Sequence, residues 1–191
     1  DSILVGNPVA GQVIMRQFSI LDSNDWPAMT AEVKTAPADG FLQTLQKLAP
    51  FASTDENRFM LNGCFLDVSE AGEGKARMVT TDGRRMTCCN TLTLPLSESC
   101  IVPITKFLTW LKGSGAIGLK KTDEQDWFAV ESGPWKYFCK AIDGTFPNYR
   151  QVIPSEEGNN RIVFADDDVG RLPQILRALP GDRDGVVVCR R

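Results

Sequence analysis

The feature that most constrains the fold of this chain is an internal repeat. VKTAPADGFLQTLQKLAP at residues 33–50 aligns with VFADDDVGRLPQILRALP at residues 163–180. An aromatic residue followed by proline precedes each copy, as Trp26-Pro27 and Phe146-Pro147. Two matches in the same order are typical of a repeated domain, although two short amphipathic helices with similar ends would also look alike.

The repeat predicts the domain organisation. A complete domain is expected at residues 30–155, with the tail of a preceding copy at residues 1–29 and the head of a following copy at residues 160–191. A chain that stops one strand into a new domain cannot close the core of that domain. We therefore expect a fragment of a protein with three or more such domains.

Three short stretches have apolar residues at helical spacing, bounded by residues that begin or end helices. The predicted helices cover residues 40–52, with Asp39 as a possible cap, a stretch from Pro103 to the residue before Gly113, and a stretch from about Gly170 to the residue before Pro180. All three are amphipathic and short, and the third is expected to have no complete sheet to cover its apolar side.

Strand-like segments precede, separate and follow the first two helices. They cover residues 30–36, 58–68, 75–81, 84–94, 116–121, 126–131 and 135–142. Asp82 and Gly83 form a strong hairpin signal between two of them. This order predicts an α+β fold of pseudo-symmetric helix-plus-three-strand units, with the helices on one face of antiparallel sheets.

The residues that usually carry catalysis are scarce. Histidine is absent, which removes the commonest general base and metal ligand. The six cysteines lack the spacing of a metal or redox site, so we interpret them as reduced and mostly buried. Asp166, Asp167 and Asp168 resemble a metal site, but their place before a predicted helix favours capping. We predict no catalytic residue, metal or cofactor, and a metal-dependent enzyme is the weakest alternative.

The charged residues are sorted unevenly. The chain carries 21 basic and 24 acidic residues, which argues against a general affinity for nucleic acid. Residues 40–52, 102–121 and 169–179 nevertheless contain seven basic residues and no acid. Such helices could present a cationic surface to phosphates while the outside repels DNA. No apolar run is long enough to span a bilayer and no signal peptide is recognisable, so the expected compartment is the cytoplasm.

Four motifs, in this order, resemble the second domain of the bacterial sliding clamp, the beta subunit of DNA polymerase III. They are RFMLNGCFLDV at residues 58–68, ARMVTTDGRRM at 76–86, IVPITKFLTWL at 101–111 and AIDGTFPNYRQVIP at 141–154. The family has an arginine shortly before LNG, a TDGHRL-like hairpin, a VP-x-K helix start and a GxFPxYxxxxP run. The resemblance covers about residues 10–155 and, more weakly, the third copy.

The resemblance implies a non-catalytic processivity factor, the DNA sliding clamp. Repeated domains form a homo-oligomeric ring around double-stranded DNA, with helices lining the channel and sheets outside. Short peptides of the DNA polymerase, the clamp loader and repair proteins dock in a pocket between the second and third domains. Carried over residue by residue, this peptide site uses Leu61, Thr81, Gly83, Arg84, Arg85, Met86 and Pro154. The residues expected to face DNA are Lys47, Arg58, Lys106, Lys112, Arg171 and Arg177.

The chain departs from the family pattern in the hairpin. Arg84 replaces the histidine of the family and Met86 its usual leucine, so the peptide preference is expected to differ. The third-domain half of the pocket is absent from this sequence, which implies weak binding in isolation. Two alternatives stay open: a hairpin end with solvated arginines, and a clamp-derived adaptor that binds peptides without forming a ring.

Overall fold

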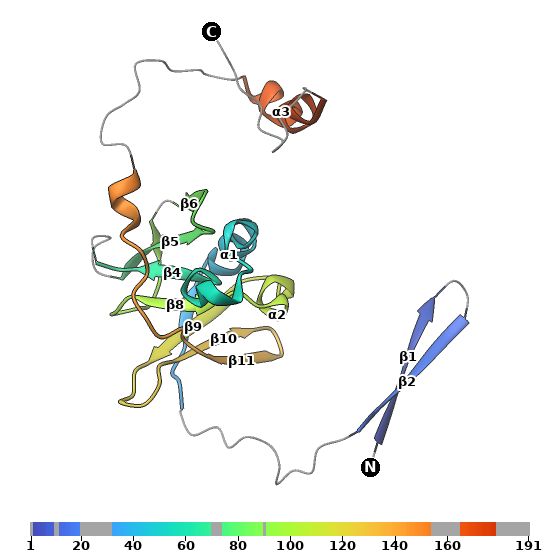
Figure 1. The fold of residues 1–191 in the computed structure, drawn as a ribbon. Coiled ribbons are helices and arrows are strands. Elements are labelled where there is room, and N and C mark those ends of the chain that lie inside the picture. Colours follow the sequence, from blue (N-terminus) through green and yellow to red (C-terminus); the bar gives the residue numbers. More distant parts are fainter. Residues whose placement is uncertain are drawn as a thin grey trace. The chain divides into compact units, whose positions relative to one another are not determined.

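A computed structural model of the chain describes residues 2–9, 12–19, 32–69, 74–89, 91–153 and 165–178. The chain divides into two compact units, Asp1–Pro147 and Asn148–Arg191. In the first unit, β1 (Ser2–Val9) and β2 (Gln12–Ser19) form a two-stranded antiparallel sheet. The remaining strands of this unit form two larger sheets (Figure 1).

The two larger sheets are antiparallel throughout. The order of the first is β11-β10-β9-β3, and it contains β3 (Ala36–Ala38), β9 (Gly115–Lys120), β10 (Trp127–Ser132) and β11 (Trp135–Lys140). The order of the second is β6-β5-β4-β8, and it contains β4 (Gly63–Asp67), β5 (Lys75–Thr81), β6 (Met86–Cys88) and β8 (Cys100–Pro103), while β7 (Leu92–Thr93) pairs with β5.

The two halves of this domain exchange a strand. The helix α1 (Phe41–Leu48) follows β3, and α2 (Lys106–Trp110) follows β8. However, β3 pairs with β9, the first strand after α2, whereas β8 pairs with β4, the first strand of its sheet after α1. Each half therefore completes the sheet of the other, which confirms the predicted pseudo-symmetric α+β fold.

Both helices are packed against the strands (Figure 1). In α1 the buried residues are Phe41, Leu42, Leu45 and Leu48. The ring of Phe41 lies 5.8 Å from that of Phe128 in β10, and Leu108 of α2 is fully buried in the same core. The apolar spacing thus predicted the buried side of each helix, because burying that side is what stabilises a short helix.

The helix boundaries differ from those predicted. Gly40, in a left-handed conformation with φ 78°, begins α1 without a side-chain cap, so the prediction for Asp39 was wrong. Pro103 is the last residue of β8 rather than the start of α2. That helix begins after Thr105, whose hydroxyl accepts a hydrogen bond from the Leu108 amide at 3.2 Å.

Three predicted strands differ in extent from the strands of the structure. Residues 56–61 form the 3₁₀ segment η3 (Glu56–Leu61), which Asp55 begins by accepting a hydrogen bond from the Asn57 amide at 2.9 Å. The strand that follows starts only at Gly63. The segment 84–94 is divided between β6 and β7, and the strand before α1 is β3 rather than residues 30–36, of which 30 and 31 lie outside the described residues.

The second unit contains η4 (Tyr149–Val152) and α3 (Asp166–Ala178). Asp166, Asp167 and Asp168 form the first turn of α3, so the helix begins before the predicted Gly170. Acidic side chains at this position complement the helix dipole, as expected. Within the described residues, no helix is long and apolar enough to cross a membrane.

Candidate partner-binding site

The β5–β6 hairpin ends in a turn that is organised by Asp82. Thr81 pairs with Met86 across the two strands, and the Asp82 amide donates to the Arg85 carbonyl at 3.3 Å. The Asp82 carboxylate accepts hydrogen bonds from the amides of Arg84 and Arg85, both at 2.9 Å. Gly83 has a φ of 87°, a conformation that favours glycine. The predicted Asp-Gly hairpin is therefore confirmed.

These hydrogen bonds stabilise the ionised form of Asp82. The backbone amide of Arg85 contributes most, followed by that of Arg84 and by the Arg85 side chain, and together they lower the pKa of Asp82 to about 2. The carboxylate is therefore charged at any physiological pH, and the turn retains its shape in the conditions where a partner would bind.

The side chain of Arg85 connects the turn to the end of α1. Its Nε atom lies 2.9 Å from a carboxylate oxygen of Asp82, and its terminal nitrogen donates to the Pro50 carbonyl at 3.1 Å. The guanidinium also lies over the ring of Phe51, 5.3 Å from its centre. Pro50 and Phe51 belong to η2 (Ala49–Phe51), which directly follows α1. Arg85 thus has a clear structural role besides any contact with a partner.

Leu61 approaches the turn from η3. A Cβ atom placed on Gly83 would lie 3.9 Å from a methyl group of Leu61 and 3.0 Å from a guanidinium nitrogen of Arg58. Arg58 donates to the Asp82 carbonyl at 3.5 Å and lies 3.6 Å from Asp55. The space beside Gly83 is therefore limited by an apolar side chain and a cation, and a larger residue at this position would fill it.

The structure brings together most of the predicted peptide site. Leu61 is buried, Thr81 and Met86 are half-buried, and Gly83, Arg84 and Arg85 are exposed. Pro154 lies outside the described residues. Such an arrangement can bind a peptide with an apolar end, because Met86 offers an adaptable apolar surface and the exposed Arg84 can donate to carbonyl or carboxylate oxygens.

The residues expected to face DNA lie on different elements. Lys47 is in the last turn of α1, Lys106 begins α2 and Lys112 follows it, and all three side chains are exposed. Arg58 instead lies beside the hairpin. The side chain of Gln46 donates to the Leu111 carbonyl, which joins the helix segments that carry Lys47 and Lys112.

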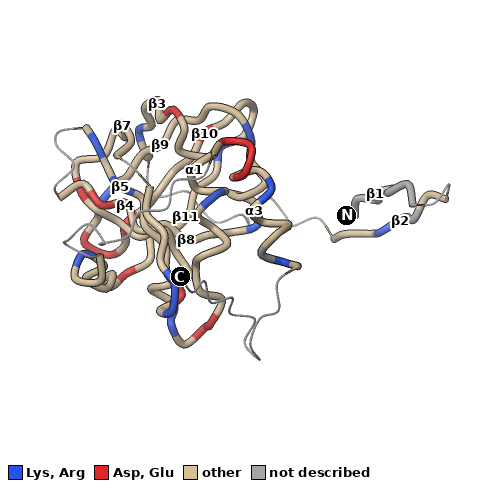
Figure 2. The backbone as a smooth tube through the Cα atoms, turned by 90° about the horizontal axis from the view of Figure 1, so that it is seen from above, with Lys and Arg blue, Asp and Glu red and all other residues tan. Residues whose placement is uncertain are grey.

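The predicted charge sorting holds for α1 and α2 but not for α3. Arg171 and Arg177 are exposed on α3, yet the same helix contains three aspartates in its first turn. The prediction of an acid-free third helix was wrong because the helix begins earlier than the apolar pattern. Figure 2 shows basic and acidic positions interspersed along the chain, so the cationic character belongs to individual helices.

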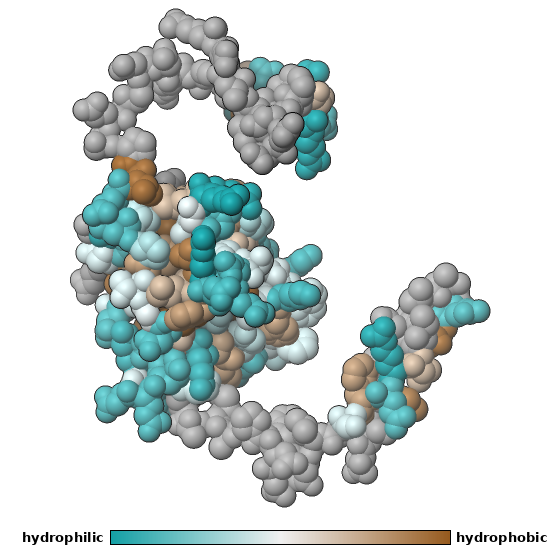
Figure 3. Space-filling view, viewed as in Figure 1, coloured by the Kyte–Doolittle hydropathy of each residue, from teal (hydrophilic) through white to brown (hydrophobic). Residues whose placement is uncertain are grey.

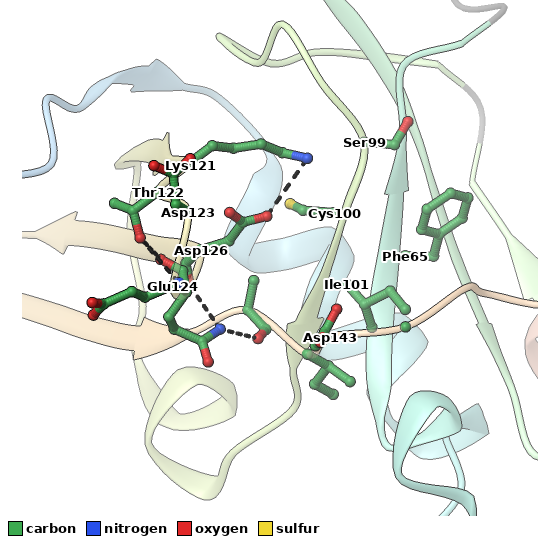
Figure 4. Close-up of a pocket in the computed structure, with 14 residues that line it drawn as sticks. Phe65, Ser99, Cys100, Ile101, Lys121, Thr122, Asp123, Glu124, Asp126 and Asp143 are labelled. Atoms are coloured by element: carbon green, nitrogen blue, oxygen red, sulfur yellow. Dashed lines mark hydrogen bonds and ion pairs between the residues drawn. The ribbon is translucent and has the colours of Figure 1, made fainter.

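The structure contains a cavity of about 290 Å³, which was not predicted from the sequence. Figure 4 shows Cys100, Ile101 and Phe65 on one side and the loop from Lys121 to Asp126 on the other. Lys121 lies 3.1 Å from Glu98 and 3.5 Å from Asp126, and the hydrogen bond to Glu98 is the main cause that raises the pKa of Lys121. Within the described residues, no group of His, Cys, Asp and Glu side chains is arranged to hold a metal ion.

The five described cysteines are free, as predicted, but only Cys64 and Cys100 are buried, while Cys89 and Cys139 are half-buried. Burial raises the pKa of Cys100 and of Cys139 to about 12, and raises that of Cys64 as well. These thiols are protonated at neutral pH and therefore unreactive. Cys88 is exposed, and Cys189 lies outside the described residues.

Known proteins support the fold and the resemblance. The family model for the central domain of the DNA polymerase III beta subunit matches residues 35–148. The beta sliding clamp of Borreliella burgdorferi is 32% identical over 128 residues, which cover 64% of this chain and 32% of that protein. The beta sliding clamp of Caulobacter vibrioides is 29% identical over 165 residues, 78% of this chain and 42% of that protein. The chain thus spans less than half of the length of these relatives.

Solved structures of clamp proteins share the fold of this chain. The DNA polymerase III subunit beta of Borrelia burgdorferi, in complex with a natural product, has a TM-score of 0.58 at 25% identity, covering 76% of this chain and 40% of that one. The Helicobacter pylori beta clamp bound to a DNA ligase peptide shares the fold, with a TM-score of 0.56 at 18% identity, covering 80% of this chain and 46% of that one. The prediction of a non-catalytic subunit agrees with the names of the relatives. The chain therefore belongs to the DNA polymerase III beta subunit family, and residues 35–148 correspond to its central domain.

Proposed function

We propose that this chain serves in a DNA sliding clamp that holds duplex DNA through its phosphates without reading the bases. The observation that carries the proposal is the match of residues 35–148 to the central domain of the family. The exposed Lys47 of α1 and Lys106 of α2 support it, because neither helix contains an acidic residue that would offset their positive charge. Cations on acid-free helices attract phosphates of any sequence.

We further propose that residues 1–29 are the tail of a preceding clamp domain, residues 30–155 a complete domain and residues 160–191 the head of a following one. At full length, such domains would form a homo-oligomeric ring on DNA in the bacterial cytoplasm. The internal repeat and the greater length of the relatives support this organisation.

The hairpin site is proposed to dock short peptides of the DNA polymerase, the clamp loader and repair proteins. Buried Leu61 and half-buried Met86 would receive the apolar end of the peptide, while Arg84 bonds its polar groups. A solved clamp with the same fold, from Helicobacter pylori, carries a DNA ligase peptide. On the face shown in Figure 3, small apolar areas lie among hydrophilic ones.

Two measurements test this function. The ring is tested on the full-length protein, which should stay on closed circular duplex and leave linear duplex through its ends; equal loss from both would exclude encirclement. Phosphate binding is tested with the 191-residue chain and two duplexes of unrelated sequence. Equal affinities that fall together as salt rises are expected, whereas a strong preference for one sequence would show that bases are read.

A further inference from the structure

The guanidinium of Arg85 is held by contacts on three sides. Its Nε atom donates to a carboxylate oxygen of Asp82 at 2.9 Å, and one terminal nitrogen donates to the Pro50 carbonyl at 3.1 Å. Its central carbon lies over the ring of Phe51, 5.3 Å from the ring centre. A long side chain that would otherwise sample many rotamers is thereby limited to one arrangement.

These contacts use only part of the hydrogen-bonding capacity of Arg85. A guanidinium carries five N–H groups, and the hydrogen bonds to Asp82 and Pro50 occupy two of them. Among the described residues, the second terminal nitrogen donates to no acceptor. Because the side chain is 62% exposed, the remaining N–H groups are left for water or for a partner.

The neighbouring cation of the turn, Arg84, lacks such restraints. Its side chain is exposed, and within the described part of the chain it makes no hydrogen bond, ion pair or ring contact. Arg84 would therefore lose its rotamer entropy when a ligand binds, whereas Arg85 has lost most of it on folding. Of the two arginines, Arg85 is the preorganised donor.

The ring of Phe51 is itself fixed between the hairpin sheet and the apolar part of the site. Phe51 ends η2, and its side chain is half-buried. Just before η2, the Leu48 carbonyl accepts a hydrogen bond from the buried Thr80 hydroxyl of β5 at 2.9 Å. Two residues after Phe51, the Ser53 amide donates to the Leu61 carbonyl at 2.9 Å. The segment that carries the ring is thus connected to the site on both sides.

We propose that Phe51 is a positioning residue of the hairpin site, which holds Arg85 in the orientation that donates to a carbonyl or carboxylate oxygen of the bound peptide. An aromatic face suits this role, because it attracts the flat guanidinium without occupying any of its N–H groups. A carboxylate in the place of the ring would take up the donors that the peptide needs. The inference deepens the proposed docking of peptides and rests on it for the identity of the ligand.

The test titrates the 191-residue chain with the DNA ligase peptide seen on the Helicobacter pylori clamp and follows binding by NMR. Phe51→Leu keeps an apolar side chain but removes the aromatic face, and it should weaken binding roughly 2- to 5-fold. Phe51→Tyr should bind like the unaltered chain, because its ring also attracts a cation. Phe51→Met takes the place of Phe51→Leu if that variant does not fold.

Two readouts separate a positioning role from a merely structural one. In the Arg85→Ala background, Phe51→Leu should cause no further loss of affinity, because the group that the ring positions is gone. Without peptide, the ¹⁵N relaxation of the Arg85 Nε–H group should show more motion in Phe51→Leu than in the unaltered chain. A structural role alone would give the same loss of affinity with and without Arg85.

Trp127→Leu is the matched control. It removes the ring over which the Lys140 ammonium lies, 5.8 Å from the ring centre, in the sheet that does not contain the hairpin. Peptide affinity and the motion of the Arg85 Nε–H group should both stay as in the unaltered chain. Circular dichroism and thermal melting show whether each variant is folded.

The results distinguish failure of the positioning role from failure of peptide docking. Unchanged affinity in folded Phe51→Leu, or an equal loss with and without Arg85, would overturn the proposal. If Met86→Ala weakens binding while Phe51→Leu does not, peptide docking stands and the positioning role alone is refuted. If the unaltered chain does not bind the peptide, the proposed docking fails, and the role of Phe51 in binding fails with it.

Discussion

Reversing the charge of two lysines on α2 should weaken the hold of this chain on duplex DNA. Lys106 begins α2 and Lys112 follows it, and both side chains are exposed. Each cation that contacts a phosphate of B-DNA contributes about 0.9 to the slope of log K against log salt, because it releases condensed counterions. Lys106→Glu with Lys112→Glu removes two such contacts, so the slope should become less steep by about 1.8.

This slope predicts how the defect changes with conditions. Between about 50 and 200 mM salt, the unaltered chain should lose roughly 12-fold more affinity than the double variant. The variant should therefore be most impaired at low salt and approach the unaltered chain as salt rises. Fluorescence anisotropy of a labelled duplex, titrated with the 191-residue chain at several salt concentrations, measures both the affinity and the slope.

A second double variant controls for net charge. Lys75→Glu with Lys140→Glu makes the same charge change on other surfaces: Lys75 alternates with buried Ala76 in β5, and Lys140 lies over the ring of Trp127. Its slope should remain that of the unaltered chain. If the α2 variant keeps the original slope, or if the control changes it as much, the lysines of α2 do not contact phosphates and the reasoning is refuted.

Three further experimental results are predicted. Met86→Ala should weaken binding of the DNA ligase peptide by about 1 to 3 kcal/mol in fluorescence polarisation, since an apolar anchor loses its contact; unchanged affinity in a folded variant would argue against the site. Asp82 should titrate at about pH 2 instead of 3.8 in carboxyl NMR, because the Arg85 amide bonds its ionised form; its stabilising effect is complete above pH 3.8 and disappears as the pH falls through 2, so a normal pKa would contradict the turn geometry. Gly118→Ala should cost about 1 to 3 kcal/mol or more in thermal unfolding, because its Cβ would lie 2.0 Å from the Lys34 carbonyl oxygen; an unchanged melting temperature would exclude that close approach.

Features that depend on neighbouring residues could be predicted from the sequence. The Asp82–Gly83 turn was predicted because left-handed glycine and an aspartate that accepts local amide bonds are sufficient to form it. The strand 75–81 coincides with β5. The start of α2 was misplaced, because proline is compatible both with the end of an edge strand and with a first helical turn.

Features that depend on distant residues could not be predicted. The bond from Arg85 to Pro50 joins residues 35 positions apart, and η2 carries no signal of that role. The exchange of β3 and β8 between the sheets reverses the pairing that chain order suggests. The ring contact between Phe107 and Trp135 arises only because β11 packs beside α2.

The position of α1 explains how one small domain can hold two proposed binding surfaces in fixed geometry. Its last turn accepts a hydrogen bond from the buried Thr80 hydroxyl of β5, at the Leu48 carbonyl and 2.9 Å, next to the hairpin. Two residues earlier, the side chain of Gln46 donates to the carbonyl of Leu111 at the end of α2. Breaking a buried hydrogen bond of this kind costs more free energy than the bond contributes when formed, because a buried polar group is then left without a hydrogen-bond partner. The hairpin and the basic end of α2 are thus both fastened to the same helix, and the four buried apolar residues of α1 hold that helix in the core. The geometry of either surface therefore depends on core packing beneath α1, and not only on the residues that would contact a peptide or DNA.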